Sequence, residues 1–146
     1  PAKLNAIHYT YNKPKTEKFI ESFKDGLRDY TPHEKGAIKL HFKSFVEQLE
    51  NPKFYGKIKD FKVVSTFTSK HVNEVANYML DKYDADVAIM VNLDIKVVSF
   101  RKSRGVDLNL GKLAEKLCDG GGSHNLAGGK LTETFANWTK TLSPIE

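Results

Sequence analysis

A glycine-rich segment around one histidine is the part of this sequence best suited to chemistry. Half of the ten glycines fall between Gly120 and Gly129, on either side of His124. Glycines let backbone N–H groups approach a ligand closely and form a concave row of donors, which suits a phosphate or a carboxylate. His124 adds a donor of adjustable charge. The segment predicts an anion-binding loop; the alternative is a tight structural loop in which His124 satisfies a neighbouring carbonyl group.

Basic residues are concentrated just before this segment. The chain has three arginines, and two of them, Arg101 and Arg104, flank Lys102 and Ser103. Residues 96–130 contain seven basic and three acidic residues, a local charge of +4 against +5 for the whole chain. Arginine is favoured over lysine where a planar fork of donors must hold phosphate oxygens. We therefore expect a phosphate site here, and the alternative is a solvated loop that follows a strand.

The elements that must position these residues form an α/β pattern from residue 61 onward. Strands are predicted for residues 61–67, 87–91 and 96–100, and helices begin after Ser69, Asn109 and Thr132. The glycine-rich stretch 119–129 is predicted to be a loop between the last two helices. This order indicates a mixed β-sheet flanked by helices.

The N-terminal part of the sequence is predicted to be helical. One helix follows Thr16, and a second begins at Thr31-Pro32-His33-Glu34, which has the pattern of a capping box. Residues 51–60 contain a proline, a glycine and several lysines, so they are the best linker candidate. We therefore expect a helical connector and linker over residues 1–60 and a second domain over residues 61–146.

Composition limits the class of protein. With 146 residues, 40% of them hydrophobic, the chain is long enough for one compact domain with a core. No apolar run approaches the roughly 20 residues of a membrane-spanning helix, so no membrane partner is expected. Cys118 is the single cysteine, which rules out an internal disulfide and favours a reducing, cytoplasmic setting.

The motifs together resemble the signature of the DHHA1 domain, the C-terminal substrate-binding domain of the DHH phosphoesterases. The resemblance rests on Ser99-Phe100-Arg101, on Val106-Asp107 before a short helix, and on the glycine-rich segment 120–129. It covers about residues 61–142, with Ser123 standing where the family has a glycine. The superfamily includes RecJ-like exonucleases, nano-RNases and cyclic-dinucleotide phosphodiesterases. The first 60 residues are more loosely similar to the connector between the two halves of these enzymes.

The resemblance implies roles for individual residues. Arg101 matches the arginine that holds a substrate phosphate or base, and His124 matches the loop histidine near the scissile bond. Glycines 120–122 match those that pass close to the nucleotide. Ser103, Arg104 and Ser123 complete the candidate site on their chemistry and position. The full set of predicted substrate-binding residues is Arg101, Ser103, Arg104, Gly120, Gly121, Gly122, Ser123 and His124.

The catalytic half that the resemblance implies is not encoded in this sequence. It holds manganese through Asp and His residues, including an Asp-His-His motif that this chain lacks. Asp84-Ala85-Asp86 only superficially resembles a metal-binding Asp-x-Asp, because two solvated carboxylates at the boundary of an element need no further explanation. The chain begins at Pro1, so we expect a part of a longer phosphoesterase (a hydrolase) that is inactive alone.

The expected partner is a short oligonucleotide, a nucleotide or another phosphodiester, whose choice among RNA, DNA and cyclic dinucleotides stays open. A homodimer is also left open. The alternative function is a stand-alone, non-catalytic module that binds RNA, as related domains do in alanyl-tRNA synthetases. A structural domain whose glycine-rich loop binds nothing is the third reading.

Overall fold

A computed structural model of the chain describes residues 3, 24–26 and 28–142. The chain divides into two compact units, Pro1–Val46 and Glu47–Glu146. The helix predicted after Thr16 lies outside the described residues. Within the described part, no helix combines the length and the apolar character needed to cross a membrane.

Helix α3 (Pro32–Leu49) begins at the predicted capping box. The hydroxyl of Thr31 accepts the Glu34 N–H at 3.2 Å, and the Glu34 carboxylate accepts the Thr31 N–H at 2.9 Å. Arg28 also donates to both carboxylate oxygens of Glu34, at 2.7 and 3.0 Å. These bonds compensate the burial of the Glu34 charge, because a buried carboxylate is costly unless it is paired.

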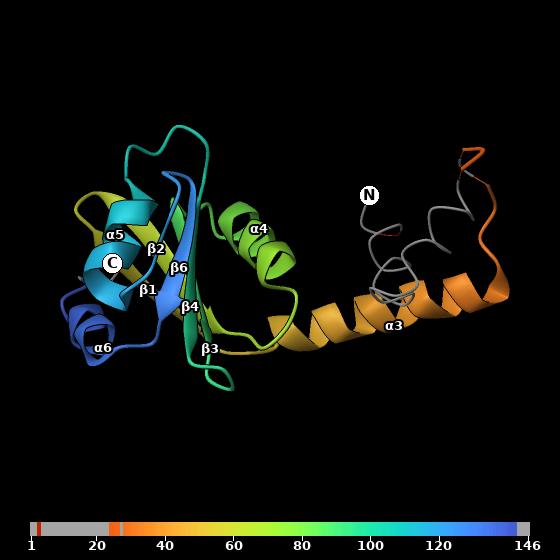
Figure 1. Cartoon of the computed structure of the whole chain (residues 1–146), viewed down its shortest axis with the longest axis horizontal. Coiled ribbons are helices and arrows are strands. Elements are labelled where there is room, and N and C mark those ends of the chain that lie inside the picture. Colours follow the sequence, from red (N-terminus) through yellow and green to blue (C-terminus); the bar gives the residue numbers. More distant parts are fainter. Residues whose placement is uncertain (1–2, 4–23, 27, 143–146) are drawn as a thin grey trace. The chain divides into compact units, whose positions relative to one another are not determined.

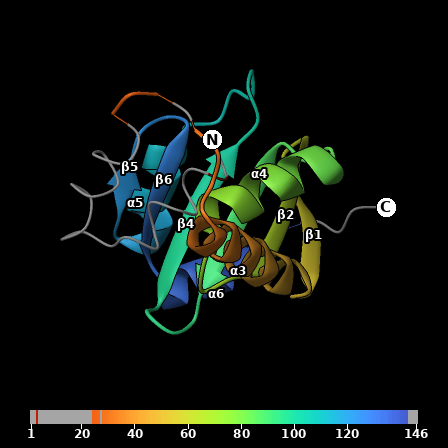
Figure 2. The ribbon, with the colours of Figure 1, turned by 90° about the vertical axis from the view of Figure 1, so that its right-hand side faces the viewer.

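The second unit is built on a six-stranded mixed sheet in the order β1-β2-β3-β4-β6-β5 (Figure 2). Strands β2 and β3 are parallel, and all other neighbours are antiparallel. The strands are β1 (Lys53–Ile58), β2 (Phe61–Phe67), β3 (Val87–Asn92), β4 (Val97–Lys102), β5 (Gly121–Gly122) and β6 (Leu126–Lys130). The expected α/β class with a mixed sheet is confirmed.

The linker expected at residues 51–60 is instead mostly an edge strand. Residues 53–58 form β1, which pairs with all of β2 except its last residue. Lys59 adopts a left-handed φ of 54° in the tight turn that joins the two strands. Pro52 and Gly56 suggested a loop, but a proline just outside an edge strand removes no ladder hydrogen bond. The aromatic pair Phe54-Tyr55 was the strand signal.

Three helices cover the two faces of the sheet (Figure 1). Helix α4 (Val72–Lys82) lies on one face, and α5 (Leu110–Cys118) and α6 (Glu133–Thr139) lie on the other. The predicted caps of α5 and α6 are confirmed, since Asn109 and Thr132 accept N–H groups of their first turns. The Ser69 cap is wrong: α4 starts three residues later, after His71 in a left-handed conformation with no side-chain cap.

The core lies between the sheet and the pair α5–α6. Every residue of β3 except Asn92 is buried, as expected for a central strand covered on both faces. Phe100 of β4 meets Phe135 of α6 edge to face, with ring centroids 6.1 Å apart. Leu110 is fully buried in the same cluster. This packing fixes the positions at which β4 ends and α5 begins, and the predicted site residues lie around both.

Candidate functional site

Strand β4 ends with two cations that point to opposite faces of the sheet. Successive side chains of a strand alternate between faces. Arg101 is hydrogen-bonded to Asn73 of α4, whereas Lys102 is hydrogen-bonded to the carbonyl groups of Val106 and Leu108, in the loop that leads to α5. Both residues therefore place positive charge at one end of the sheet, but Arg101 donates to a residue of α4 and Lys102 donates to the loop before α5.

The guanidinium of Arg101 is held in place by several acceptors. Its Nε and Nη2 donate to Asn73 Oδ1 at 3.1 and 2.7 Å. Its Nη1 donates to the Phe100 carbonyl at 2.8 Å and to the Ala127 carbonyl at 3.5 Å. Partial burial lowers the pKa of Arg101 from its ordinary value, although an arginine remains charged. The contact with Asn73 was not predicted, because nothing in the sequence pairs an exposed asparagine with an arginine 28 residues away.

Lys102 contacts His124 directly. The distance between Lys102 Nζ and His124 Nδ1 is 2.5 Å, and Nζ lies 2.7 Å from the Val106 carbonyl and 2.9 Å from the Leu108 carbonyl. The other ring nitrogen, Nε2, lies 3.9 Å from Asp107 Oδ1. Lys102 was not among the predicted site residues, although it lies between Arg101 and Ser103 in the sequence.

The glycine-rich segment is a hairpin rather than the predicted loop. Strands β5 and β6 pair through Gly121–Gly128 and Gly122–Ala127, and residues 123–125 form the turn. A Cβ on Gly120 would lie 2.1 Å from the Gly128 carbonyl oxygen, and one on Gly122 would lie 2.4 Å from that of Leu126. Gly121 has more room, with its nearest neighbour at 3.9 Å. Close contact between backbones accounts for Gly120 and Gly122.

Several amide donors of this segment are used inside the domain. The Gly120 N–H donates to the carbonyl of Ala114 in the middle of α5, and the Ser123 N–H donates to the Leu126 carbonyl. The Ser123 hydroxyl accepts the N–H groups of Asn125 and Leu126, at 3.3 and 3.1 Å. An anion at this hairpin would therefore depend on side chains more than on a row of free amides.

The hairpin turn is also fixed to the start of α5. The His124 carbonyl accepts the Leu110 N–H at 3.1 Å, and Asn109 caps the same helix through its side chain. The side chain of His124 remains 47% exposed. The backbone of His124 is thus held by a buried helix while its ring is accessible from solvent.

The remaining predicted residues have separate environments. Ser103 donates its hydroxyl to the Ala85 carbonyl at 2.8 Å, which ties β4 to the start of β3. Arg104 is exposed and precedes Gly105, whose φ of 80° suits a glycine in a turn.

The Asp84-Ala85-Asp86 sequence is engaged with Lys62. Asp86 accepts the Lys62 N–H at 2.7 Å, and the Lys62 ammonium lies 3.9 Å from the Asp84 carboxylate. These contacts agree with the reading of two carboxylates at an element boundary.

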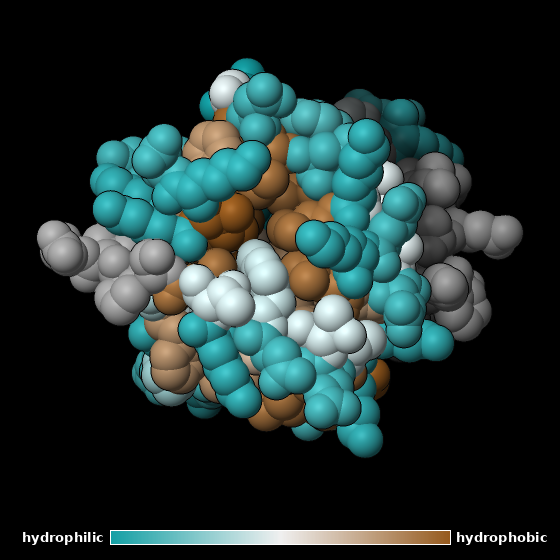
Figure 3. Space-filling model, turned by 90° about the vertical axis from the view of Figure 1, so that its left-hand side faces the viewer, coloured by the Kyte–Doolittle hydropathy of each residue, from teal (hydrophilic) through white to brown (hydrophobic). Residues whose placement is uncertain are grey.

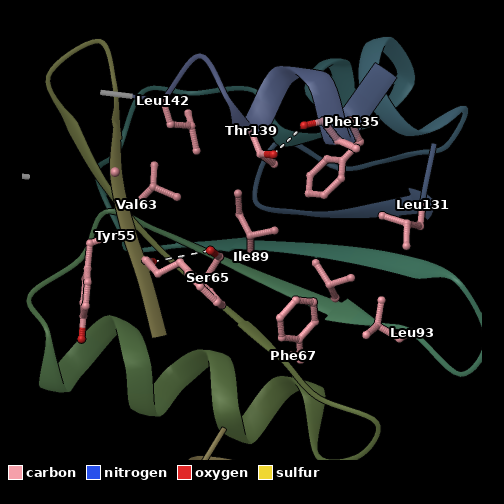
Figure 4. A pocket seen from close by; sticks show the side chains of 14 residues that line it. Tyr55, Val63, Ser65, Phe67, Ile89, Leu93, Leu131, Phe135, Thr139 and Leu142 are labelled. Carbon is pink, nitrogen blue, oxygen red and sulfur yellow. Dashed lines mark hydrogen bonds between the residues drawn. The ribbon is translucent and has the colours of Figure 1, made fainter. Parts of the chain in front are cut away.

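An apolar pocket of about 430 Å³ lies elsewhere, between strands β1–β3 and helix α6. Figure 3 views the side that carries α5 and α6 and shows hydrophobic side chains in a hollow ringed by hydrophilic ones. None of the described lining residues carries a charge, and the hydroxyls of Ser65 and Thr139 donate to backbone carbonyls (Figure 4). This pocket does not suit a phosphate, so the end of β4 remains the better candidate.

No protein-family model and no curated protein matches the sequence. The fold is similar to part of a pGpG-specific phosphodiesterase, PggH from Vibrio cholerae, with a TM-score of 0.50 and 18% identity. An exopolyphosphatase-related protein from Bacteroides fragilis gives a TM-score of 0.46 at 16% identity, and an uncharacterized protein from Helicobacter pylori G27 gives 0.48 at 19%.

The matches cover most of this chain but less than half of each matched chain. The chain is covered over 86% of its length by the Vibrio cholerae match, over 88% by the Bacteroides match and over 76% by the Helicobacter match. It spans 43%, 42% and 33% of those chains, respectively. This chain thus has the fold of a portion of a phosphodiesterase structure and less than half its length.

Proposed function

We propose that this chain is the DHHA1-like, substrate-binding part of a phosphoesterase. It holds the phosphate end of a nucleotide or short oligonucleotide, and a separate domain hydrolyses the phosphodiester. The observation that carries the proposal is the positive charge at the end of β4, beside the glycine hairpin, where Arg101 lies on one face of the sheet and the Lys102–His124 pair lies on the other. The fold likeness to part of a phosphodiesterase supports it.

The chain's own residues supply binding and orientation. One Nη2 hydrogen of Arg101 remains for a phosphate oxygen, since Asn73 and two carbonyls engage the rest of the fork. His124 offers its accessible Nε2, and Arg104 adds an exposed cation on the loop after β4. Hydrogen bonds between charged groups contribute about 1.5–3 kcal/mol each, so two or three contacts suit a weakly bound small substrate.

The manganese that the resemblance implies does not fit the end of β4. Lys and Arg side chains offer donors and positive charge, whereas a divalent cation needs oxygen or nitrogen lone pairs. Manganese, bound in the other domain, would supply an activated water for attack on phosphorus. No step of that reaction is assigned to residues of this chain.

Titration of the ¹⁵N-labelled chain with a 5′-phosphorylated dinucleotide tests the proposal. We expect amide shifts in residues 101–104 and 120–126, and little change along β1. Arg101→Ala and His124→Ala should reduce the shifts, while Lys116→Ala, an exposed lysine in the last turn of α5, should leave them unchanged. Unchanged signals around residues 120–129 at millimolar ligand would refute the proposal.

A further inference from the structure

We propose that Lys102 is a positioning residue that fixes His124 as a neutral ring with its proton on Nε2. In this role Lys102 does not touch the substrate. It makes His124 a fixed hydrogen-bond donor for a phosphate oxygen. The inference rests on the proposed function for the identity of the ligand, but the state of the ring is measurable without any ligand.

The Lys102 ammonium is surrounded by three hydrogen-bond acceptors. A lysine ammonium has three N–H donors and no acceptor. Three acceptors lie within 2.9 Å of Nζ: the carbonyls of Val106 and Leu108, and His124 Nδ1. The two carbonyl oxygens favour the charged ammonium. Nδ1 also lies 3.4 Å from Asn125 Oδ1, an acceptor, but its contact with the ammonium is much shorter. Because that ammonium can only donate, we assign Nδ1 as the acceptor and place the ring proton on Nε2.

The backbone of His124 is held at the start of α5. The His124 carbonyl is bonded to the first residue of α5, and Leu110 is fully buried. Lys102 is anchored in turn by carbonyl groups of the loop that enters the same helix. The His124 backbone and the Lys102 ammonium are therefore both tied to α5 and to the loop that enters it. An imidazolium would direct a second N–H at the ammonium across 2.5 Å, so it would have to break this contact.

The Nε2 atom of His124 faces the carboxylate of Asp107. Asp107 Oδ1 is 3.9 Å away, beyond hydrogen-bond distance, and the Asp107 side chain is fully exposed. The Nε2–H is thus available to a ligand oxygen at the cost of displacing a solvated carboxylate. With Nδ1 engaged, His124 binds a phosphate oxygen through its Nε2–H.

Long-range ¹H–¹⁵N correlation spectra of the histidine rings test the inference in the free protein at pH 7.5. His124→Ala identifies the signals of this ring. We expect an Nε2–H tautomer whose Nδ1 resonance shifts in Lys102→Met and returns toward its wild-type position in Lys102→Arg. Lys130→Met, the same change at an exposed lysine in the hairpin that carries His124, should leave the Nδ1 resonance in place. An Nδ1–H ring, an imidazolium, or an Nδ1 signal that Lys102→Met does not move would overturn the inference.

A double-mutant cycle with the 5′-phosphorylated dinucleotide adds a second readout. Lys102→Met and His124→Ala should each weaken binding by about tenfold, the scale of one such hydrogen bond, and the double variant should lose little more. Additive losses would overturn the positioning role. If the dinucleotide fails to bind the wild-type chain, the proposed function fails, while the ring spectra still decide the role of Lys102. The tautomer is read from the wild-type spectrum, assigned with His124→Ala, so it is decided even if Lys102→Met does not fold.

Discussion

Arg101 is the single side chain whose removal should cost the most binding affinity. Its fork is set in advance by Asn73 and by the Ala127 carbonyl, so little side-chain entropy is lost when it meets a phosphate. We predict that Arg101→Ala weakens binding of a 5′-phosphorylated dinucleotide by about 10- to 150-fold, the equivalent of about 1.5–3 kcal/mol. Isothermal titration calorimetry measures this change.

The control for Arg101 separates binding from folding. Arg101 is half-buried, so its variant must be shown to retain the fold by circular dichroism and by a ¹⁵N spectrum with the wild-type pattern outside α4 and β4. Lys116→Ala removes an equal charge from an exposed position and should bind as the wild type does. Equal losses from the two variants would mean that net charge, and not this site, governs binding.

Cys118 should be unreactive in the folded chain. Burial, with a smaller contribution from the Asp119 charge, raises the pKa of this thiol to about 11. At pH 8 the thiolate fraction is then about two orders of magnitude below that of an unperturbed cysteine. We predict correspondingly slow labelling by a thiol reagent under native conditions and fast labelling in urea. Rapid native labelling would contradict this.

The same shift makes stability depend on pH. The folded pKa lies above the unfolded value of 9.0, so the folded state keeps a proton that the unfolded state loses. This contribution is fully present below about pH 9 and is lost as the pH rises toward 11. The melting temperature of the wild type should therefore fall more steeply over this interval than that of Cys118→Ala, which has no thiol to titrate.

Two adjacent glycines at the start of the β5–β6 hairpin should differ in how far an alanine substitution destabilises the domain. A Cβ on Gly120 would overlap the Gly128 carbonyl, whereas one on Gly121 would have its nearest neighbour at 3.9 Å. We predict that Gly120→Ala destabilises the domain by about 1–3 kcal/mol or more, and that Gly121→Ala changes stability by about 0.5 kcal/mol or less. Urea unfolding followed by tryptophan fluorescence measures both. Equal stabilities would show that the hairpin packs less tightly than described.

Helix α5 provides a second pair. Leu110 is fully buried beneath the helix start, while Leu113, one turn later, is only partly buried at the edge of the core. Leu110→Ala should destabilise by about 2–5 kcal/mol through the cavity it leaves. Leu113→Ala should cost clearly less, because less apolar surface is lost and solvent can fill the space. The reverse order in chemical denaturation would refute this placement of α5.

Elements with a strong local signal were predictable. The capping residues Thr31, Asn109 and Thr132 mark helix starts because their side chains bond to nearby amides, which is a property of a few consecutive residues. Strand β1 was missed although Phe54 and Tyr55 favour a strand, because Pro52 and Gly56 indicate a loop and the pairing with β2 that stabilises this edge strand is not a local property. The β5–β6 hairpin was missed for a related reason: glycines carry no strand propensity, and pairing across residues 121–128 decides the structure.

Across the whole domain, two groups can be distinguished among the predicted site residues. Arg101 and His124 lie at the same end of the sheet with accessible polar atoms, while Ser103 and Gly120 are engaged in contacts that hold the fold. Residue types and spacing locate a basic end of the domain. They do not reveal Asn73 or the role of Lys102, because both depend on which face of the sheet each side chain occupies.

The net charge of +5 bears on the choice between a binder of short substrates and a general RNA-binding module. If Arg101 and Arg104 make the phosphate contacts, about two counterions are released, and log K against log salt should have a slope of about −1 to −2. This slope should be the same for a dinucleotide and a 20-nucleotide RNA, and Arg101→Ala should reduce its magnitude by about 1. Fluorescence anisotropy at 50–300 mM salt measures it. A slope that steepens with RNA length would favour the RNA-binding module, because a longer strand would then be neutralised by lysines across the surface rather than by one site.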